Sequence, residues 1–433
     1  MNSKPAFTQM KILNIAGATK WSLNGGPFGS KLVSKMYVAH GVPVIRGINL
    51  PLDQRFFDDD FVYVSAEKAR ELEAHVARPG DVIFTQRGTL GQVGIIPENS
   101  KYPKYIISQS QMKLTVNRSC ADPHYVYYAF RSPDICTNFV SLASTSGVPH
   151  VNLQTLRDFK ISLPDIGTQR RIASILGAYD DLIEVNRRRI KVLEEMARGL
   201  FEEWFVRFRF PGHENVPIVD TPDGPLPEGW NTQTIEETFD LLGGGTPSKA
   251  VDSYWVDGSV NWYTPTDLTG ARTLFMDESS TKITAEGLAK SSAKLFPTNS
   301  IMMTSRATIG AISICTTNAS TNQGFITCLP NDWVPRTYLY YWLTKNVPTF
   351  IAHATGATFK EITKGVFKKL KITVPAEHIT KRFESTARPM HDMILAIERS
   401  TRKLTSSRDL LLPRLISGQL SVEAAEQMPE AAE

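Results

Sequence analysis

Two stretches of the chain, Pro79–Gly91 and Pro297–Gly310, follow the same pattern and decide how the rest of the sequence is interpreted. The first reads PGDVIFTQRGTLG and the second reads PTNSIMMTSRATIG. Each opens on a turn signal, continues as a short apolar run typical of a buried strand, and ends in a basic, Thr-containing turn that closes on glycine. The two copies lie about half the chain length apart, which indicates a long internal repeat.

Four further matches occur in the same order on either side of these two stretches. They pair Gly25–Ser30 with Gly243–Ser248, Ser108–Ser110 with Asn322–Gly324, Pro123–Tyr128 with Pro335–Tyr341, and Ser146–Pro164 with Thr355–Pro375. Five matches in one order are not a chance result. The sequence is therefore a tandem duplication of a mixed α+β globule, in which short strands alternate with helices and Gly/Pro-rich turns.

Composition sets limits on the class of protein. At roughly 100–200 residues per domain, 433 residues hold two to four domains. The hydrophobic share of 42% and charged share of 21% are those of a globular protein. A net charge of +4 permits a nucleic-acid partner without establishing one.

Cysteine usage and apolar runs indicate where such a chain resides. The four cysteines are scattered and form no C-x-x-C motif, so we expect reduced thiols and neither a disulfide framework nor a structural zinc site. No apolar run reaches 18 residues, and residues 1–14 contain no apolar signal-peptide core. These features predict a soluble, cytoplasmic protein with no membrane partner.

A long helical segment follows each globule, at about Gln169–Phe205 and Ile379–Ile416. Both keep a strict 4-3 apolar spacing over four to five heptads, which is typical of a coiled coil. The alternative is an ordinary surface helix that packs on its own globule. The predicted seam includes Ile183, Asn186, Ile190, Leu193 and Leu200 in the first helix, and Ile394, Ile397, Leu404 and Leu411 in the second.

The predicted fold is thus α+β, with two tandem-duplicated mixed α/β domains separated by two long coiled-coil helices. The predicted boundaries are a first globule at 1–165, a central spacer helix at 166–209, a Pro-rich linker at 210–229, a second globule at 230–376, a C-terminal spacer helix at 377–418 and a loose tail at 419–433.

Motifs for catalysis are missing from the sequence. Residues 240–246, DLLGGGT, superficially resemble an S-adenosylmethionine turn, but Pro247 interrupts the helix that should follow. There is no G-x-x-x-x-G-K-[ST] loop, no paired-histidine metal motif and no nucleophile elbow. The sequence therefore favours a binding protein over an enzyme, with no catalytic residue, metal or cofactor of its own.

Polar and basic residues at equivalent loop positions are the candidate binding groups. Arg87 and Arg306 are either solvated turn residues or contacts to phosphate or guanine, for which Arg is the usual side chain. Gln109 and Gln323 either bind adenine or merely cap the sheet. The other candidates are Lys31 and Lys249 after the glycine turns, Thr89 and Thr308 beside the arginines, and His150 and Lys360 in the Gly/Ser/Thr-rich loops.

Two diverged globules, each followed by a long heptad helix, resemble the specificity (S) subunit of a type I restriction–modification system. The resemblance rests on the glycine turns, the two copies of the PGDVIFTQRGTLG pattern and the Tyr-Tyr helices. It extends to the I-x-L-P segments before the long helices and to the closing segment Leu410–Gly418, LLLPRLISG. It covers nearly the whole chain.

The resemblance implies a DNA-binding subunit without catalysis of its own. Each globule would be a target recognition domain for one part of a bipartite, asymmetric site on double-stranded DNA. The two long helices would pack antiparallel as a coiled coil, space the globules and dock two methyltransferase (M) subunits, which bind S-adenosylmethionine. Restriction (R) subunits, which use ATP and Mg²⁺, would join the same complex.

Two other classes remain open at this point. A catalytic DNA adenine methyltransferase with fused recognition domains would bind S-adenosylmethionine as an isolated chain. A repeat scaffold that binds only proteins would show no sequence-selective DNA binding when its partners are supplied.

Overall fold

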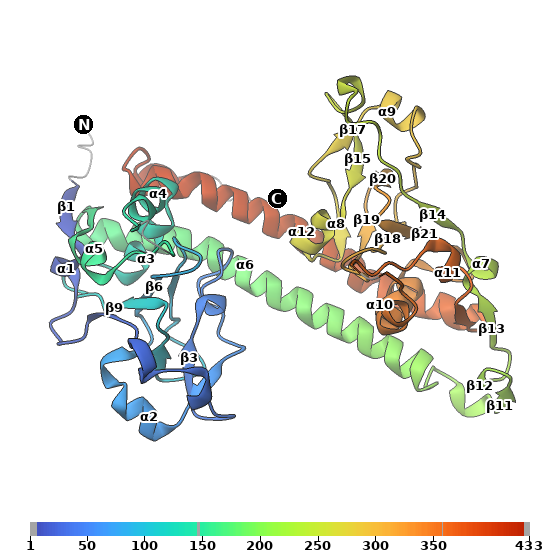
Figure 1. Ribbon diagram of the computed structural model, residues 1–433, viewed down its shortest axis with the longest axis horizontal. Coiled ribbons are helices and arrows are strands. Elements are labelled where there is room, and N and C mark those ends of the chain that lie inside the picture. The colour runs from blue at the N-terminus through green and yellow to red at the C-terminus, as the bar shows by residue number, and fades with distance from the viewer. Residues whose placement is uncertain (1–6, 145–147, 357, 428–433) are drawn as a thin grey trace. The chain divides into compact units, whose positions relative to one another are not determined.

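The computed structural model describes residues 7–144, 148–356 and 358–427, and its chain divides into two compact units (Figure 1). Unit 1 comprises Met1–Asn186 and Ser400–Glu433, and unit 2 comprises Arg187–Arg399. Each unit therefore contains one globule together with a segment of each long helix. Among the described residues, no helix is both long enough and apolar enough to cross a membrane.

Unit 1 contains two four-stranded sheets. The first has the antiparallel order β2-β9-β6-β7 and the second the order β4-β3-β8-β5, in which β3 and β8 are parallel. A third pair, β1 with β10, joins the start of the globule to its end. The strands are β1 (Thr8–Lys11), β2 (Leu23–Gly25), β3 (Val42–Ile45), β4 (Val62–Val64), β5 (Val76–Ala77), β6 (Val82–Thr85), β7 (Val93–Ile95), β8 (Tyr105–Ile107), β9 (Gln111–Leu114) and β10 (Lys160–Leu163).

The core of unit 1 forms where α3 covers the first sheet. Strand β6 is buried at all four residues, as a short apolar run predicts. Phe84 packs edge-to-face on Phe130 of α3, with ring centroids 4.7 Å apart. Asp122 caps α3 by accepting hydrogen bonds from the backbone amides of residues 124 and 125. The helices of this globule are α1 (Ile12–Ile15), α2 (Ala66–Glu71), α3 (Pro123–Arg131), α4 (Pro133–Ser141) and α5 (Leu153–Asp158).

Unit 2 repeats this topology. Its main sheet has the order β14-β21-β18-β19-β16, of which the first four strands correspond to β2-β9-β6-β7. The pair β13–β22 corresponds to β1–β10, and a second sheet has the order β17-β15-β20. The strands are β13 (Asn231–Thr234), β14 (Leu241–Gly243), β15 (Val260–Tyr263), β16 (Phe275–Met276), β17 (Lys282–Ile283), β18 (Ile301–Thr304), β19 (Ile312–Cys315), β20 (Ala319–Thr321), β21 (Phe325–Cys328) and β22 (Lys371–Val374).

The helices of the second globule differ from those of the first in two respects. Helix α8 follows β15, whereas a 3-10 turn at Gly47–Asn49 follows β3. A single helix, α10, takes the place of the pair α3 and α4, and it continues through Pro348, whereas Pro133 begins a new helix in unit 1. The helices are α7 (Ile235–Thr238), α8 (Pro265–Ala271), α9 (Ala285–Ala289), α10 (Arg336–Ala352) and α11 (Lys364–Phe367). The mixed sheets and the duplicated order confirm the predicted α+β fold.

The two long helices are α6 (Ile166–Phe201), which continues as a short π-helical turn at Glu202–Val206, and α12 (Glu377–Ile416). They run antiparallel within each unit. In unit 1, Asp180 of α6 pairs with Arg408 of α12, while Asn186, further along α6, bonds to Thr401, earlier in α12. In unit 2, Phe201 of α6 packs on Phe383 of α12.

The predicted seam residues are buried to different degrees. Ile183, Asn186, Ile394, Leu404 and Leu411 are buried. Ile190, Leu193, Leu200 and Ile397 are half-buried, and the first three pack against the core of unit 2. Asn186 meets a polar partner, because its Nδ2 donates to Thr401 Oγ1 at 3.2 Å.

The structure corrects two of the predicted segments. Within the predicted linker 210–229, β11 (Ile218–Thr221) and β12 (Gly224–Pro227) form an antiparallel hairpin, and Leu226 is buried in the core of unit 2. Within the predicted loose tail, α13 (Val422–Glu426) is a helix capped by Ser421. The tail prediction is therefore wrong for 421–427, because apolar burial and ion pairs from Arg171 to Glu423 and Glu426 hold α13 in place. Residues 428–433 lie outside the described residues.

Candidate nucleic-acid interface

The predicted binding loops of unit 1 leave the main sheet at one edge. Gly25, the last residue of β2, pairs with Met112 near the start of β9, and Thr85, the last residue of β6, pairs with Gln111. Because these strands are antiparallel, the loops that follow β2 and β6 and the loop that precedes β9 all lie at the same edge. We call residues 26–31, 86–91, 108–110 and 148–152 the loop edge of unit 1.

Backbone hydrogen bonds tie these loops into one row. The Gly26 amide donates to the Gln111 carbonyl at 2.8 Å. Gln86 donates to the Ser110 carbonyl at 2.6 Å, and its own carbonyl accepts from the Val151 amide at 3.1 Å. Residue 86 therefore joins three segments that are far apart in the sequence.

Unit 2 has an equivalent row, which we call the loop edge of unit 2 (residues 244–249, 305–310, 322–324 and 358–363). Thr304, the last residue of β18, pairs with Phe325, the first residue of β21. The Ser305 amide donates to the Gly324 carbonyl at 2.8 Å, and the Ile362 amide donates to the Ser305 carbonyl at 2.9 Å. The backbone of Ser305 thus makes the same two hydrogen bonds in unit 2 that the backbone of Gln86 makes in unit 1.

The two arginines lie at equivalent places in these rows. Single β-bridges link Arg87 to His150 and His150 to Ser144 in unit 1, and they link Arg306 to Glu361 and Glu361 to Thr355 in unit 2. Both arginine residues are exposed. The Arg306 guanidinium lies 3.8 Å from the Glu361 carboxylate, whereas unit 1 has a histidine at that position. The two edges therefore share a backbone frame and differ in charge.

Glycine is required where the turn after β2 contacts the loop before β9, and where the turn after β14 contacts the loop before β21. A Cβ atom on Gly26 would lie 1.9 Å from the Ser108 carbonyl oxygen, and one on Gly244 would lie 1.9 Å from the Asn322 carbonyl oxygen. Because no side chain fits at such a distance, the backbones approach closely only with glycine there. The packing of the backbone therefore requires glycine at both positions.

The two glutamines hold these glycine turns. Gln109 Nε2 donates to the carbonyl of Gly29 and, at 3.3 Å, to that of Leu32. Gln323 Oε1 accepts from Thr246 Oγ1 at 2.6 Å. Both alternatives for these residues, binding of adenine and capping of the sheet, stay predictions.

The structure brings all ten predicted binding residues onto the two loop edges. Nine of them are exposed and His150 is half-buried. They are Lys31, Arg87, Thr89, Gln109 and His150 in unit 1, and Lys249, Arg306, Thr308, Gln323 and Lys360 in unit 2. Their role in binding stays a prediction.

Sequence reasoning missed three exposed apolar residues on the same edges, Phe28, Val148 and Phe359. A large apolar side chain inside a loop of small and polar residues was the available signal. Val148 and Phe359 also occupy the same repeat position, two residues before the bridging residues His150 and Glu361.

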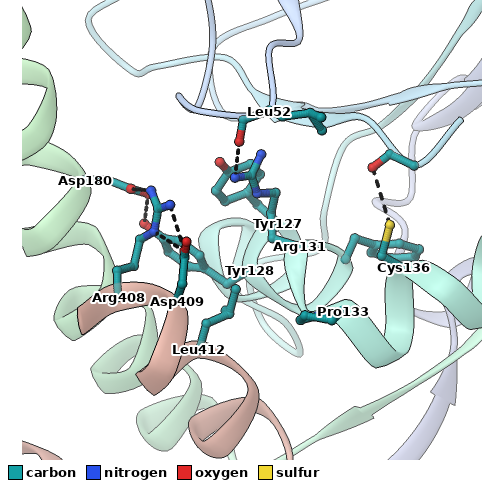
Figure 2. A pocket seen from close by; sticks show the side chains of 12 residues that line it. Leu52, Tyr127, Tyr128, Arg131, Pro133, Cys136, Asp180, Arg408, Asp409 and Leu412 are labelled. Atoms are coloured by element: carbon teal, nitrogen blue, oxygen red, sulfur yellow. Dashed lines mark hydrogen bonds and ion pairs between the residues drawn. The ribbon is translucent and has the colours of Figure 1, made fainter. Parts of the chain in front are cut away.

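A pocket of about 300 Å³ in unit 1 is lined by residues of α3, α4 and the two long helices (Figure 2). Asp180 accepts a hydrogen bond from Tyr128 Oη at 2.7 Å and pairs with Arg408 at 2.6 Å. Arg131 donates to the carbonyl of Leu52. The polar side chains of this pocket thus hold the globule on α6 and α12.

The chemistry of the pocket does not suit catalysis. Burial raises the pKa of the Cys136 thiol, so the thiol is a poor nucleophile near neutral pH. Burial and the neighbouring Asp180 carboxylate also raise the pKa of the Tyr128 phenol, which therefore stays protonated and donates its hydrogen bond. Among the described residues, no three His, Cys, Asp or Glu side chains are grouped so that they would hold a metal ion.

Unit 2 has a different polar contact at the equivalent place. Tyr341 of α10, the counterpart of Tyr128, shares a hydrogen bond of 2.9 Å with Nε2 of His391 in α12. Burial lowers the pKa of His391 to about 3, and the positive charge of Arg336 adds to this shift. The rings of Phe275 and Tyr340 also pack around this imidazole, which is therefore neutral at pH 7.

We expect acid to weaken unit 2 through His391. Its folded-state pKa of about 3 lies below the ordinary 6.5, so the unfolded chain binds a proton that the folded chain does not. The stabilisation is complete above pH 6.5 and is lost as the pH falls towards 3. Between pH 7 and pH 5 the free energy of unfolding should fall by about 2 kcal/mol.

Hydrogen exchange of the α10 amides in urea, at pH 7 and pH 5, measures this loss. His391→Gln serves as the control, because it removes the titration at this site and leaves the rest of the chain unchanged. An equal pH dependence in the two proteins would contradict the assignment to His391.

Each α+β globule carries a loop edge of the same design, built from basic and polar loops, and an antiparallel helix pair joins the two globules. These are the features expected of a two-module nucleic-acid-binding protein. Comparison with known proteins makes the class specific. The family model described as the type I restriction modification DNA specificity domain matches residues 68–195 and 227–384. These two matches cover more than half of the chain, and the chain therefore belongs to this family.

Individual relatives agree with this membership. The type I restriction enzyme HindI specificity subunit of Haemophilus influenzae is 22% identical over 463 residues, which cover 90% of this chain and 97% of that one. The MjaIX specificity subunit of Methanocaldococcus jannaschii is 30% identical over 193 residues, 44% of each chain. The crystal structure of an S subunit from M. genitalium has the same fold, with a TM-score of 0.61 at 14% identity over 96% of this chain and 97% of that one.

Family membership settles the broad function. The chain is the DNA sequence-recognition subunit of a type I restriction–modification complex and is not itself an enzyme. The alternative of a catalytic DNA methyltransferase with fused recognition domains is not favoured.

Proposed function

We propose that the loop edge of each unit binds one part of a bipartite site on double-stranded DNA. The observation that carries this proposal is the equivalent placement of exposed Arg87 and Arg306 at the ends of two corresponding strands. Arg at such a position contacts either phosphate or guanine. Because the two edges differ at the residue that bridges each arginine, His150 or Glu361, the two parts of the site differ and the whole site is asymmetric.

We further propose that α6 and α12 set the distance between the two parts of the site and dock two methyltransferase subunits. Each helix contributes a segment to both units, so a change in its length acts between the globules and not within them. The internal repeat presents two similar surfaces, which suits two copies of one partner. The predicted seam residues on these helices are the first candidates for docking.

The remaining components of the reaction belong, in this proposal, to the partners. Methyltransferase subunits bind S-adenosylmethionine, and restriction subunits use ATP and Mg²⁺, while this chain needs no cofactor. The complex acts in the cytoplasm, where the four free thiols stay reduced.

Removing the arginines tests the loop edges. Arg87→Ala and Arg306→Ala should each weaken DNA binding by the assembled complex, by about 1–3 kcal/mol with relaxed selectivity in one part of the site if the side chain contacts a base. If it contacts only phosphate, affinity should fall equally for all sequences and the salt slope should shrink by about one. Affinity measured at several salt concentrations separates the two cases.

Arg78→Ala is the matched control, because Arg78 is exposed but precedes β6 at the end opposite the loop edge. Unchanged DNA affinity in both loop-edge variants would show that Arg87 and Arg306 are solvated turn residues.

Lengthening the helices tests their proposed role as a spacer. One heptad inserted into each helix at the unit boundaries, after Asn186 and after Arg399, adds about 10 Å at 1.5 Å per residue. This corresponds to about three base pairs at 3.4 Å each. Sequencing of the methylated sites in a host that carries the whole complex should show the same bases with a wider gap.

A four-residue insertion at the same points is the control, since it turns the seam away from its partner and should impair assembly. A heptad variant that assembles and still methylates the original site at the original spacing would refute the spacer.

A further inference from the structure

The side chains of Val148 and Phe359 are exposed to solvent at equivalent positions of the repeat. The fractional exposure is 69% for Val148 and 62% for Phe359. Each precedes by two residues the bridging residue beside the loop-edge arginine. Single exposed apolar residues are common on protein surfaces. Two large ones that recur at one position in diverged globules indicate a shared use.

Charged and polar residues surround both side chains. Lys360 follows Phe359 directly, and the next residue, Glu361, lies 3.8 Å from Arg306. Val148 lies two residues before His150, which bridges to Arg87. An apolar side chain gains nothing from a phosphate. On a nucleic acid, its favourable contacts are the faces of bases and the methyl group of thymine.

The backbone arrangement favours the major groove of DNA. The bridge from His150 to Arg87 pairs two backbone segments in unit 1, and the bridge from Glu361 to Arg306 does so in unit 2. Neighbouring strands lie about 4.8 Å apart, so such a two-stranded pair with its side chains is roughly 10 Å wide. The major groove, about 12 Å wide, admits a β-ribbon, whereas the minor groove of about 6 Å does not.

On the basis of the proposed function, we propose that Val148 and Phe359 are specificity-determining residues that contact thymine methyl groups in the major groove, one in each part of the DNA site. The exposed arginine beside each residue then faces the same groove, where guanine presents its acceptors. It follows that each part of the site contains at least one A·T pair. The two side chains differ in reach, so the position of that pair differs between the two parts.

Uracil substitution tests the contact directly, because uracil is thymine without the methyl group. The assembled complex is titrated with its own site, identified from the methylated bases, in which the thymines of one part are replaced by uracil. Loss of one buried methyl contact should weaken binding about fourfold. With Phe359→Ala, the same replacement in the part that unit 2 contacts should have no further effect, and Val148→Ala should behave likewise for the other part.

Two exposed apolar residues away from the loop edges provide matched controls, Leu13→Ala for unit 1 and Ile218→Ala for unit 2. Both should keep the full response to uracil. Equal responses to uracil in the wild type, Val148→Ala and Phe359→Ala would overturn the proposal, as would a site in which either part lacks an A·T pair. Variants that bind DNA normally but fail to assemble with the partner subunits would assign these residues to a protein contact instead.

The outcome is separable from that of the proposed function. If the complex methylates a bipartite site and uracil has no effect, only the methyl contact fails. If no bipartite site is found, the proposed function fails first.

Discussion

Asp180→Ala is expected to lower the free energy of unfolding of unit 1 by about 3–5 kcal/mol, because breaking a buried ion pair leaves an uncompensated charge. The Arg408 and Asp180 side chains are only 7% and 4% exposed, with nitrogen and oxygen 2.6 Å apart. Arg408 keeps only its contact to Asp409, whose side chain is 57% exposed. Tyr128 also loses its acceptor, so a second buried polar group is left without a hydrogen bond.

Hydrogen exchange of the α3 amides during urea denaturation of the full chain reports the stability of unit 1. Asp181→Ala is the matched control, since its carboxylate is 67% exposed and Arg55 keeps its ion pair with Glu184. We expect that change to cost under about 1 kcal/mol. The double variant Asp180→Ala/Arg408→Leu should recover much of the loss, and an Asp180→Ala protein as stable as the wild type would contradict the ion pair.

Phe383→Ala should destabilise unit 2 by about 3–5 kcal/mol, the usual range for a fully buried phenylalanine. The Phe383 side chain in α12 is 0% exposed. Its ring lies against Phe201, Trp204 and Phe205 from the end of the first long helix, with centroids 6.1, 5.8 and 5.0 Å away. Truncation therefore opens a cavity where both helices meet the globule.

Hydrogen exchange of the α10 amides measures this effect. Met393→Ala, ten residues further along α12 and 54% exposed, is the control and should change stability by less than about 0.5 kcal/mol. A loss below about 1 kcal/mol in Phe383→Ala would mean that the helix end is not packed as described.

The repeat and the long helices could be predicted because their signals are local. Apolar spacing marks a helix without knowledge of its partner, and the observed ends of α6 and α12 lie within a few residues of the predicted ones. The loop edges were predictable for a related reason. Arg87 and Arg306 each lie two residues beyond the end of an apolar strand, and equivalent strands in a repeat place such residues at equivalent edges.

The elements that were not predicted depend on distant partners. Helix α13 is five residues long and acidic, and Arg171, far away in the sequence, supplies its ion pairs. The hairpin β11–β12 contains Pro225 and Pro227, which are tolerated because a strand in a two-stranded sheet has one free side. The pairing of Arg408 with Asp180 follows only from the antiparallel register of the two long helices.

The close approach at Gly26 and Gly244 divides each loop edge into positions that can vary and positions that cannot. The exposed side chains of the edges can be exchanged at little cost in stability, typically within about 0.5 kcal/mol. A β-carbon at either glycine would collide with a carbonyl oxygen 1.9 Å away. A combinatorial library randomised at Arg87, Thr89, Thr308 and Phe359 should therefore yield mostly folded proteins with new targets, whereas one that also randomises the two glycines should yield mostly misfolded ones. The same backbone can therefore carry different recognition residues as restriction specificity evolves.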